Sequence, residues 1–218
     1  ELPGVRYAIT TNGGAIVDLE TGEQLMACTL SPQKAVDLLE ITREFDVMAD
    51  PYIGGRAVTE ERCMAQLHHY GLSEGMQTMV HDTRDVVRDV VEYVRQSGKG
   101  VEKINIFFAD IADRAPLRCR LEQESGIAIT AAMVNNLELN DENATKGNGL
   151  MWLADYLGVD REATMAVGDG ENDVSMIRMA GVGVAMDNAL DLVKQYADEI
   201  TLTNDEDGVA AVIERLIG

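Results

Sequence analysis

The chain has 218 residues, of which 46% are hydrophobic and 26% are charged, and its formal net charge is −20. This length can bury a full core in one large domain or two smaller ones, and the composition is that of a globular protein rather than a disordered one. The negative charge argues against nonspecific binding to nucleic acid or to an anionic membrane, because both partners require basic surface. We therefore expect neither a nucleic-acid partner nor a membrane partner.

Targeting signals and cysteine motifs do not stand out in the sequence. No segment approaches the roughly 20 consecutive apolar residues of a membrane span, and no basic start followed by an apolar core resembles a signal peptide. A cytoplasmic location is therefore expected. Cys28, Cys63 and Cys119 are widely spaced and form no Cys-x-x-Cys pair, which argues against a disulfide framework or a zinc site. We expect three buried thiols.

The first two thirds of the chain mix strands and helices without a regular alternation. Ser31 and Pro32 supply an N-cap and a first-turn proline for one helix, and valines at helical spacing indicate another between Asp82 and Gly98. The expected elements are strands at 5–9 and 15–18 around a turn at 10–14, a helix from Ser31, a strand near Val47, a turn at 54–55, a helix at 62–70, a helix from Asp82 to Gly98, a strand at 103–109, a helix at 116–125 and a strand-like segment at 127–139.

After Asn140 the sequence changes to an alternation of helices and short apolar strands. Such alternation predicts a parallel sheet with helices on both faces. We expect helices at 145–157, 174–180, 190–197 and 209–216, and strands at 164–167, 182–185 and 200–203. In the last helix Val209, Val212, Ile213 and Leu216 form one apolar stripe.

These patterns predict an α/β protein with two domains. The core is a doubly wound, Rossmann-like, mostly parallel sheet formed by residues 1–28 and 138–218, and an α+β cap domain is inserted at residues 29–137.

An acidic loop follows the apolar strand at 164–167. Asp169 lies at the carboxyl end of that strand, which is the edge where open α/β sheets bind ligands. Together with Glu171, Asn172 and Asp173 it places four oxygen-bearing side chains on one turn, a set suited to Mg²⁺. The alternative is a polar loop in which Asn172 or Asp173 caps the next helix.

Lys146 is the second candidate residue. It lies in the first turn of a helix whose Leu150, Leu153, Ala154 and Leu157 are expected to face the core. A cation at this end opposes the helix dipole at a cost of only about 0.3 to 1 kcal/mol, so a solvated surface lysine is one interpretation. The other is that the lysine and the helix N-terminus together receive an anion.

Three further features are weaker. The acidic loop is not an EF-hand, because its sixth position counted from Asp169 is Val174 rather than glycine. The segment 205–208, Asp-Glu-Asp-Gly, is expected to be an acidic turn that caps the final helix. His68 and His69 are expected to be a surface pair on a helix.

The lysine and the acidic loop belong to an ordered set of short motifs. The set comprises Asn12-Gly13-Gly14-Ala15, Asn143-Ala144-Thr145-Lys146-Gly147, Gly168-Asp169-Gly170-Glu171-Asn172-Asp173, Met176, Ala180-Gly181, Val184-Ala185-Met186, Asn188-Ala189, and Asn204 with Glu206-Asp207-Gly208-Val209. In this order, and over most of the chain outside the cap, it closely resembles the Cof-type sugar-phosphatase family of the haloacid dehalogenase superfamily.

The resemblance implies roles for individual residues. Lys146 matches the catalytic lysine that stabilises the transferring phosphoryl group, and Asp169 matches the catalytic aspartate that binds Mg²⁺. Asn172 and Asp173 match the residues that orient the lysine and complete the metal shell, so the implied metal ligands are Asp169 and Asp173. The implied phosphate- or substrate-binding residues are Asn12, Gly13, Lys146 and Asn172.

The resemblance also implies an activity. It is that of a Mg²⁺-dependent phosphatase, a phosphoric monoester hydrolase, which acts on small phosphorylated metabolites such as sugar phosphates through an aspartyl-phosphate intermediate. The inserted domain would be a lid that sets substrate identity. The alternatives are a phosphomutase or other phosphotransferase of the same superfamily, and a noncatalytic fragment that binds a metal or a partner.

One motif of the family is not found in these 218 residues. The nucleophilic aspartate is expected in an Asp-x-Asp-Gly motif at the end of the first core strand, whereas Glu1 resembles the approach to the third. We expect that two βα units, on the order of 50 to 60 residues, lie outside the sequence. The 218 residues alone are then expected to be inactive and to leave a gap in the sheet.

Overall fold

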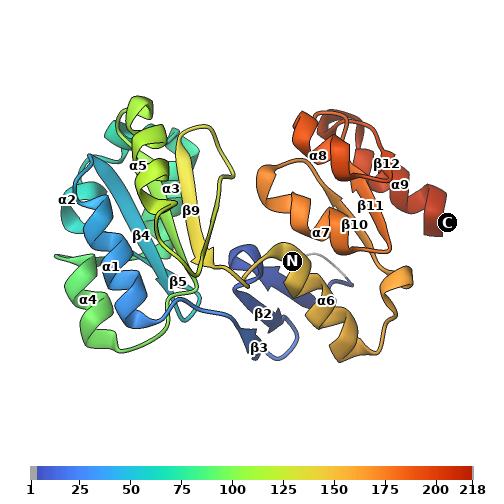
Figure 1. The fold of residues 1–218 in the computed structure, drawn as a ribbon, viewed down its shortest axis with the longest axis horizontal. Coiled ribbons are helices and arrows are strands. Elements are labelled where there is room, and N and C mark those ends of the chain that lie inside the picture. Colours follow the sequence, from blue (N-terminus) through green and yellow to red (C-terminus); the bar gives the residue numbers. More distant parts are fainter. Residues whose placement is uncertain (1–3, 218) are drawn as a thin grey trace. The chain divides into compact units, whose positions relative to one another are not determined.

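The computed structural model describes residues 4–217, and the chain forms two compact units (Figure 1). One unit contains Glu1–Met26 and Ala144–Gly218, and the other contains Ala27–Asn143. Glu1, which the sequence places at the approach to a core strand, lies outside the described residues. None of the helices in the described part of the chain is long and apolar enough to cross a membrane.

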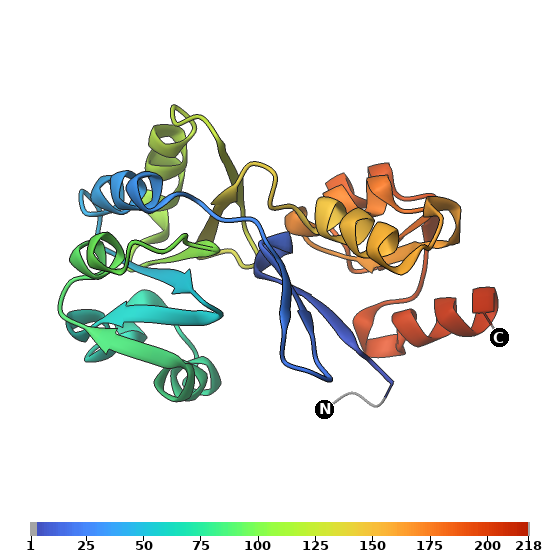
Figure 2. The ribbon, with the colours of Figure 1, turned by 90° about the horizontal axis from the view of Figure 1, so that it is seen from below.

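The first unit contains two small sheets. Strands β1 (Tyr7–Thr10), β2 (Ala15–Asp18) and β3 (Gln24–Ala27) form one of them, in which β1 and β2 are antiparallel, and Figure 2 shows this ribbon in dark blue. The other consists of the parallel strands β10 (Met165–Gly168), β11 (Val182–Ala185) and β12 (Glu199–Ile200). The helices of this unit are α6 (Lys146–Leu157), α7 (Val174–Met179), α8 (Asp191–Tyr196) and α9 (Gly208–Ile217).

The α/β class predicted from the sequence is confirmed by this arrangement. Helix and strand alternate along the chain from α6 to α9, and β10, β11 and β12 run parallel. Buried side chains at the contact of α7 and α8 with the strands include Ile177, Ala185 and Val193. The carboxyl ends of β10 and β11 are therefore held side by side, with Gly168 paired to Ala185.

Two apolar helix faces of this unit are less covered than the sequence predicts. Leu157 in α6 is 45% exposed although it was expected to face the core. In α9 only Val212 of the predicted stripe is buried, whereas Val209, Ile213 and Leu216 are exposed. Amphipathic spacing predicts the helix and its apolar face, but burial requires a second element against that face.

The second unit has one six-stranded sheet in the order β6-β5-β4-β7-β9-β8, and only β5 and β6 in it are parallel neighbours. Its strands are β4 (Val47–Ile53), β5 (Arg56–Glu60), β6 (Arg84–Val87), β7 (Lys103–Phe108), β8 (Ile127–Thr130) and β9 (Asn136–Asp141). Its helices are α1 (Pro32–Thr42), α2 (Glu61–Met64), α3 (Glu74–Thr83), α4 (Val90–Ser97) and α5 (Arg114–Leu121).

The helices α1, α4 and α5 cover one face of this sheet, as Figures 1 and 2 show. Ile104, Ile106 and Leu137 belong to the buried cluster under these helices. Met48 and Phe107 belong to a second cluster with residues of α2 and α3. Because β9 continues to Asp141, this unit extends past the predicted boundary at residue 137.

The predicted helix from Asp82 to Gly98 is wrong in its first half. Helix α3 ends at Thr83, Arg84–Val87 is strand β6, and a new helix, α4, begins at Val90 with Asp89 as its N-cap. The valine spacing is misleading because Val87 packs against the same core from a strand as Val90, Val91 and Val94 do from the helix.

Two smaller expectations in this unit also need correction. The predicted helix at 62–70 is broken into α2 and a 3₁₀ turn at Leu67–Tyr70. Of the three cysteines, which are all free thiols, only Cys63 is buried, whereas Cys28 is half-buried and Cys119 is exposed. Spacing excludes a disulfide motif, but it does not reveal which side of a helix or strand a thiol occupies.

Candidate active site

The acidic loop wraps around one buried carboxylate at the end of β10. Asp173, only 5% exposed, accepts hydrogen bonds through Oδ2 from the backbone N–H groups of Asp169 (2.9 Å) and Gly170 (3.0 Å). A Cβ atom at Gly168 would lie 2.5 Å from the Cβ of Asp173, so only glycine permits this approach. The loop is thus folded onto the carboxylate of Asp173.

Lys146 meets this carboxylate from the first turn of α6. Its Nζ lies 2.5 Å from Asp173 Oδ1, and the side chains of Lys146 and Asp173 are 30% and 7% exposed. Thr145 caps α6 by accepting a hydrogen bond from Asn148 N. Asp173 makes no such bond to α7, so its side chain serves the loop and the lysine rather than the helix terminus.

A close contact between α6 and α7 sets the position of the lysine. Gly147 N donates a hydrogen bond to Ser175 Oγ at 3.0 Å. A Cβ at Gly147 would lie 2.5 Å from the Ser175 carbonyl oxygen, so the glycine allows the two helices to approach. Ser175 is not predictable from the sequence, because no local pattern marks a serine in the first turn of a helix as the partner of a glycine 28 residues earlier.

Asp169 is exposed and is held at three points. Its N–H is bonded to Asp173, its backbone carbonyl accepts from Leu190 N at 3.1 Å, and its carboxylate Oδ2 accepts from Asn188 Nδ2 at 3.1 Å. The other carboxylate oxygen, Oδ1, receives no hydrogen bond from residues 4–217. One oxygen of Asp169 is therefore available to an external partner.

The segment 11–13 brings Asn12 to the loop. Asn172 Nδ2 donates to Asn12 Oδ1 at 3.2 Å. Thr11, Asn12 and Gly13 all have positive φ (48°, 60° and 96°), a conformation that costs roughly 1 to 3 kcal/mol at each non-glycine position. A Cβ at Gly13 would lie 2.1 Å from the carbonyl oxygen of Thr145, so the segment is pressed against the start of α6.

The structure therefore brings all six predicted site residues into one connected group. Lys146 contacts Asp173, Asp173 holds the loop at Asp169, Asn172 contacts Asn12, and Gly13 lies against Thr145. The roles assigned to these residues from the family resemblance stay predictions.

The residues of this group can supply some of the ligands of a divalent cation, but not a complete set. No group of three or more His, Cys, Asp or Glu side chains that could hold a metal ion occurs in the described part of the chain. Mg²⁺, however, is commonly bound by one or two carboxylates, with waters and substrate phosphate oxygens as the other ligands. The Oδ1 atom of Asp169 suits that role, whereas both oxygens of Asp173 are already engaged by protein donors.

An apolar cavity of about 300 Å³ lies beside Lys146. In the described residues β10 pairs only with β11, so the other edge of β10 has no strand against it. The cavity is lined by residues of β1, α6, β10 and α7, namely Ile9, Lys146, Leu150, Met165, Ala166, Val167 and Met176.

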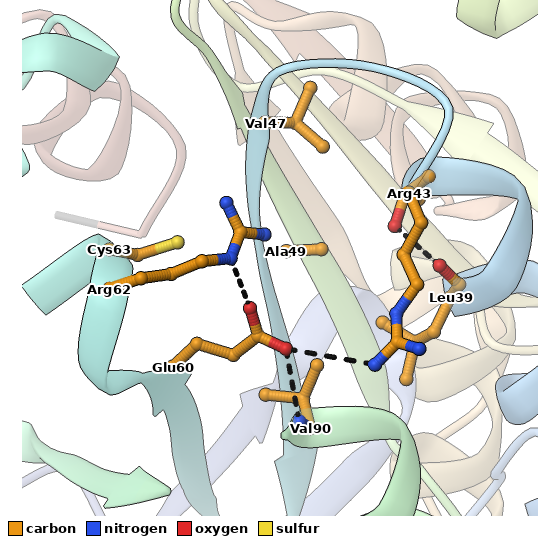
Figure 3. Close-up of a pocket in the computed structure, with 9 residues that line it drawn as sticks. Leu39, Arg43, Val47, Ala49, Glu60, Arg62, Cys63 and Val90 are labelled. Carbon is orange, nitrogen blue, oxygen red and sulfur yellow. Dashed lines mark hydrogen bonds and ion pairs between the residues drawn. The ribbon is translucent and has the colours of Figure 1, made fainter. Parts of the chain in front are cut away.

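A second pocket lies in the other unit and is too small for a metabolite (Figure 3). Its volume is about 10 Å³, which is room for a single water molecule. Glu60 is one of its lining residues and pairs with Arg62 at 2.6 Å, lies 3.9 Å from Arg43 and accepts from Val90 N at 3.3 Å. The Glu60 carboxylate thus contacts residues next to α1, in α2 and in α4, and both arginines that line the pocket lie within ion-pair distance of it.

The weaker sequence features do not join the group around Lys146. Thr203 and Glu206 form a capping box, and Asp207 adopts a left-handed conformation just before α9, so segment 205–208 is a turn at a helix start. His69 pairs with Asp46 at 2.7 Å.

Comparison with known proteins places the chain in a family. The profile of the haloacid dehalogenase-like hydrolases matches residues 1–213. A Bacillus subtilis protein named 5-amino-6-(5-phospho-D-ribitylamino)uracil phosphatase YwtE is 29% identical, over 96% of this chain and 78% of its own length.

Solved structures agree with this match. A haloacid dehalogenase-like hydrolase from Bacteroides thetaiotaomicron is 32% identical with a TM-score of 0.75, over 96% of this chain and 76% of the other. A second hydrolase of this kind, from B. subtilis, is 26% identical with a TM-score of 0.81, over 98% and 80% of the two chains. The chain therefore belongs to the haloacid dehalogenase-like hydrolase family, as an enzyme of the phosphatase type.

Proposed function

We propose that the protein is a Mg²⁺-dependent phosphatase that hydrolyses phosphoric monoesters of small metabolites. The observation that supports this most directly is the placement of Lys146, Asp169 and Asp173 at the carboxyl end of β10, with the lysine 2.5 Å from Asp173 and one oxygen of Asp169 available. A cation and a fixed lysine are the groups that stabilise a transferring phosphoryl group.

Each residue has a distinct part in this proposal. Lys146 neutralises charge on the phosphoryl oxygens, and Asp173 holds the lysine in place. Asp169 offers its free oxygen to the cation, which when bound neutralises further negative charge on the phosphate. Asn12, Gly13 and Asn172 are assigned to binding of the substrate phosphate, which their position beside the acidic loop and the start of α6 supports.

We further propose that an aspartate outside the 218 residues is the nucleophile. Its carboxylate attacks phosphorus, the alcohol of the substrate leaves, and water then hydrolyses the aspartyl phosphate to release inorganic phosphate. Two features support a segment that carries this aspartate beside β10. Among residues 4–217 no strand pairs with the edge of β10 that faces away from β11, and the adjacent cavity of about 300 Å³ is mainly apolar.

The substrate class rests on the relatives and on the family resemblance. YwtE, named for a phosphorylated ribityl compound, covers most of this chain at 29% identity. We propose a phosphorylated polyol, sugar or related cofactor precursor, whose organic part is selected by the inserted unit.

A phosphomutase or other phosphotransferase remains the second candidate, and product analysis separates the two: a phosphatase releases inorganic phosphate, whereas a mutase returns a phosphorylated isomer.

The test compares the 218-residue chain with an N-terminally extended protein that carries the nucleophile segment. We expect Mg²⁺-dependent release of phosphate from sugar phosphates by the extended protein only. Asp169→Asn in the extended protein should abolish metal-dependent turnover while its circular dichroism spectrum stays unchanged. Hydrolysis by the 218-residue chain would refute the proposal of an external nucleophile, and full activity of the Asp169 variant would remove this residue from the site.

A further inference from the structure

We propose that Asn188 is a positioning residue that orients the Asp169 carboxylate for the cation. The inference rests on the proposed function, since it concerns the metal site of the same enzyme. Asn188 lies in the turn between β11 and α8 and is exposed. The family resemblance included this residue only as part of a motif, without a role.

The direction of the Asn188 amide is set by its second partner. Its Oδ1 accepts a hydrogen bond from Asn204 N at 2.9 Å. A backbone N–H can only donate, so the carbonyl oxygen of the amide must face Asn204 and the NH₂ group must face the other way. The NH₂ group therefore donates to Asp169 Oδ2, at 3.1 Å.

This is the one hydrogen bond that the described residues make with the Asp169 carboxylate. The backbone of Asp169 is held separately, through its N–H by Asp173 and through its carbonyl by Leu190. Loss of the Asn188 side chain should therefore leave the path of the loop unchanged and free the rotation of the Asp169 carboxylate, although it also removes the acceptor of Asn204 N.

The consequence for a cation follows from the two carboxylate oxygens. With Oδ2 engaged by Asn188, Oδ1 is the oxygen that a cation would meet, which favours binding through a single oxygen. Partners that orient a metal ligand typically change metal affinity about 10- to 100-fold when they are removed. Because Asn188 and Asp169 are both exposed, we expect an effect at the lower end of that range.

The experiment measures Mn²⁺ binding directly, by the electron paramagnetic resonance signal of free Mn²⁺, in the extended protein. We expect Asn188→Ala to raise the dissociation constant about tenfold. Asn188→Ser should raise the dissociation constant by a similar factor, because the serine side chain is too short for its hydroxyl to reach the Asp169 carboxylate. Gln33→Ala is the matched control, since Gln33 donates its amide to Asp37 at 2.8 Å on the exposed surface of α1. This control should bind Mn²⁺ as the wild type does.

A kinetic measurement separates positioning from a general structural role. If Asn188 only orients Asp169, phosphatase activity of both variants should recover at saturating metal, with the metal concentration for half activation raised about tenfold. Activity that stays low at saturating metal, together with a lowered unfolding temperature, would show a structural role and overturn the inference.

The outcomes also distinguish this inference from the proposed function. If Asp169→Asn binds Mn²⁺ as the wild type does, the proposed metal role of Asp169 fails, and the inference fails with it. If Asp169→Asn loses binding while both Asn188 variants match the wild type, only the inference on Asn188 is wrong.

Discussion

The ion pair between Lys146 and Asp173 can be removed without removing the other bonds of Asp173. In Asp173→Asn the amide oxygen can still accept from the backbone N–H groups of Asp169 and Gly170, which now bond to Oδ2. The NH₂ group then occupies the place of Oδ1 and faces the ammonium group of Lys146. Both groups are hydrogen-bond donors, so Lys146 loses its hydrogen bond and ion pair with residue 173. The loop keeps the hydrogen bonds from the backbone N–H groups of Asp169 and Gly170.

The expected cost follows from the burial of the two groups. A hydrogen bond between charged groups contributes about 1.5 to 3 kcal/mol when it is buried and about 0.2 to 1 kcal/mol when it is exposed. The Asp173 side chain is 7% exposed and that of Lys146 is 30% exposed, so the pair lies between these cases. We expect the free energy of unfolding to fall by about 1 to 2 kcal/mol.

Trp152 provides the assay, since it is the single tryptophan of the chain and lies in α6, stacked on Tyr156 with 5.2 Å between ring centroids. Urea unfolding followed by its fluorescence therefore reports on the unit that contains the site. Glu199→Gln is the control, because Glu199 and Arg215 form a more exposed pair (38% and 54%) in the same unit, which should contribute less than about 1 kcal/mol. Equal costs for the two variants would refute the reasoning.

Two more predictions concern other parts of the chain. Gly13→Ala should destabilise the same unit by about 2 to 4 kcal/mol, because its Cβ would lie 2.1 Å from the Thr145 carbonyl oxygen and its φ is +96°. Gly22→Ala, with φ +74° and no atom within 4 Å of the new Cβ, should cost only about 1 kcal/mol in the same tryptophan assay, and equal costs would contradict the predicted clash. Burial raises the pKa of Asp50 from 3.8 to about 6, against the opposing effect of Arg84. Because the folded state then holds the proton more tightly than the unfolded state, this group should lower the unfolding free energy as pH rises from about 4 to about 6, with no further change above. The urea concentration at the unfolding midpoint, followed by circular dichroism, should fall over this pH range in the wild type, and this contribution to the fall should be absent in Asp50→Asn. An identical pH dependence of the midpoint in both proteins would contradict the prediction.

The C-terminal part of the fold was predictable because its signals are local. Buried parallel strands are short apolar runs, and these runs alternate here with helices along the chain. The strand at 182–185 was predicted with its observed bounds, and α6 begins at Lys146, one residue after the Thr145 that caps it. The acidic loop was found by the same reasoning, since a polar residue directly after such a strand lies at the ligand-binding edge.

The parts that could not be predicted depend on contacts between distant segments. β6 is a strand because it pairs with β5, and its valines alone also fit a helix. The partner of Asp169 is 19 residues further along the chain, and the partner of Asn172 is 160 residues earlier, so no spacing rule leads from one to the other. The exposed stripe of α9 shows the same limit, because periodicity predicts an apolar face without identifying what covers it.

The charges of the site explain why a cation is required in the proposed reaction. Lys146 is the lysine at this loop, but its charge is opposed by Asp173 at 2.5 Å, and Asp169 and Glu171 add two further carboxylates. On a chain with a net charge of −20, such a loop would repel a phosphate monoester. Lys146 and these three carboxylates together carry two more negative than positive charges, and a divalent cation on Asp169 would cancel this excess next to the lysine. We therefore expect phosphate to bind the metal-loaded site far better than the metal-free one, so that substrate binding at the acidic loop would depend on the proposed cation.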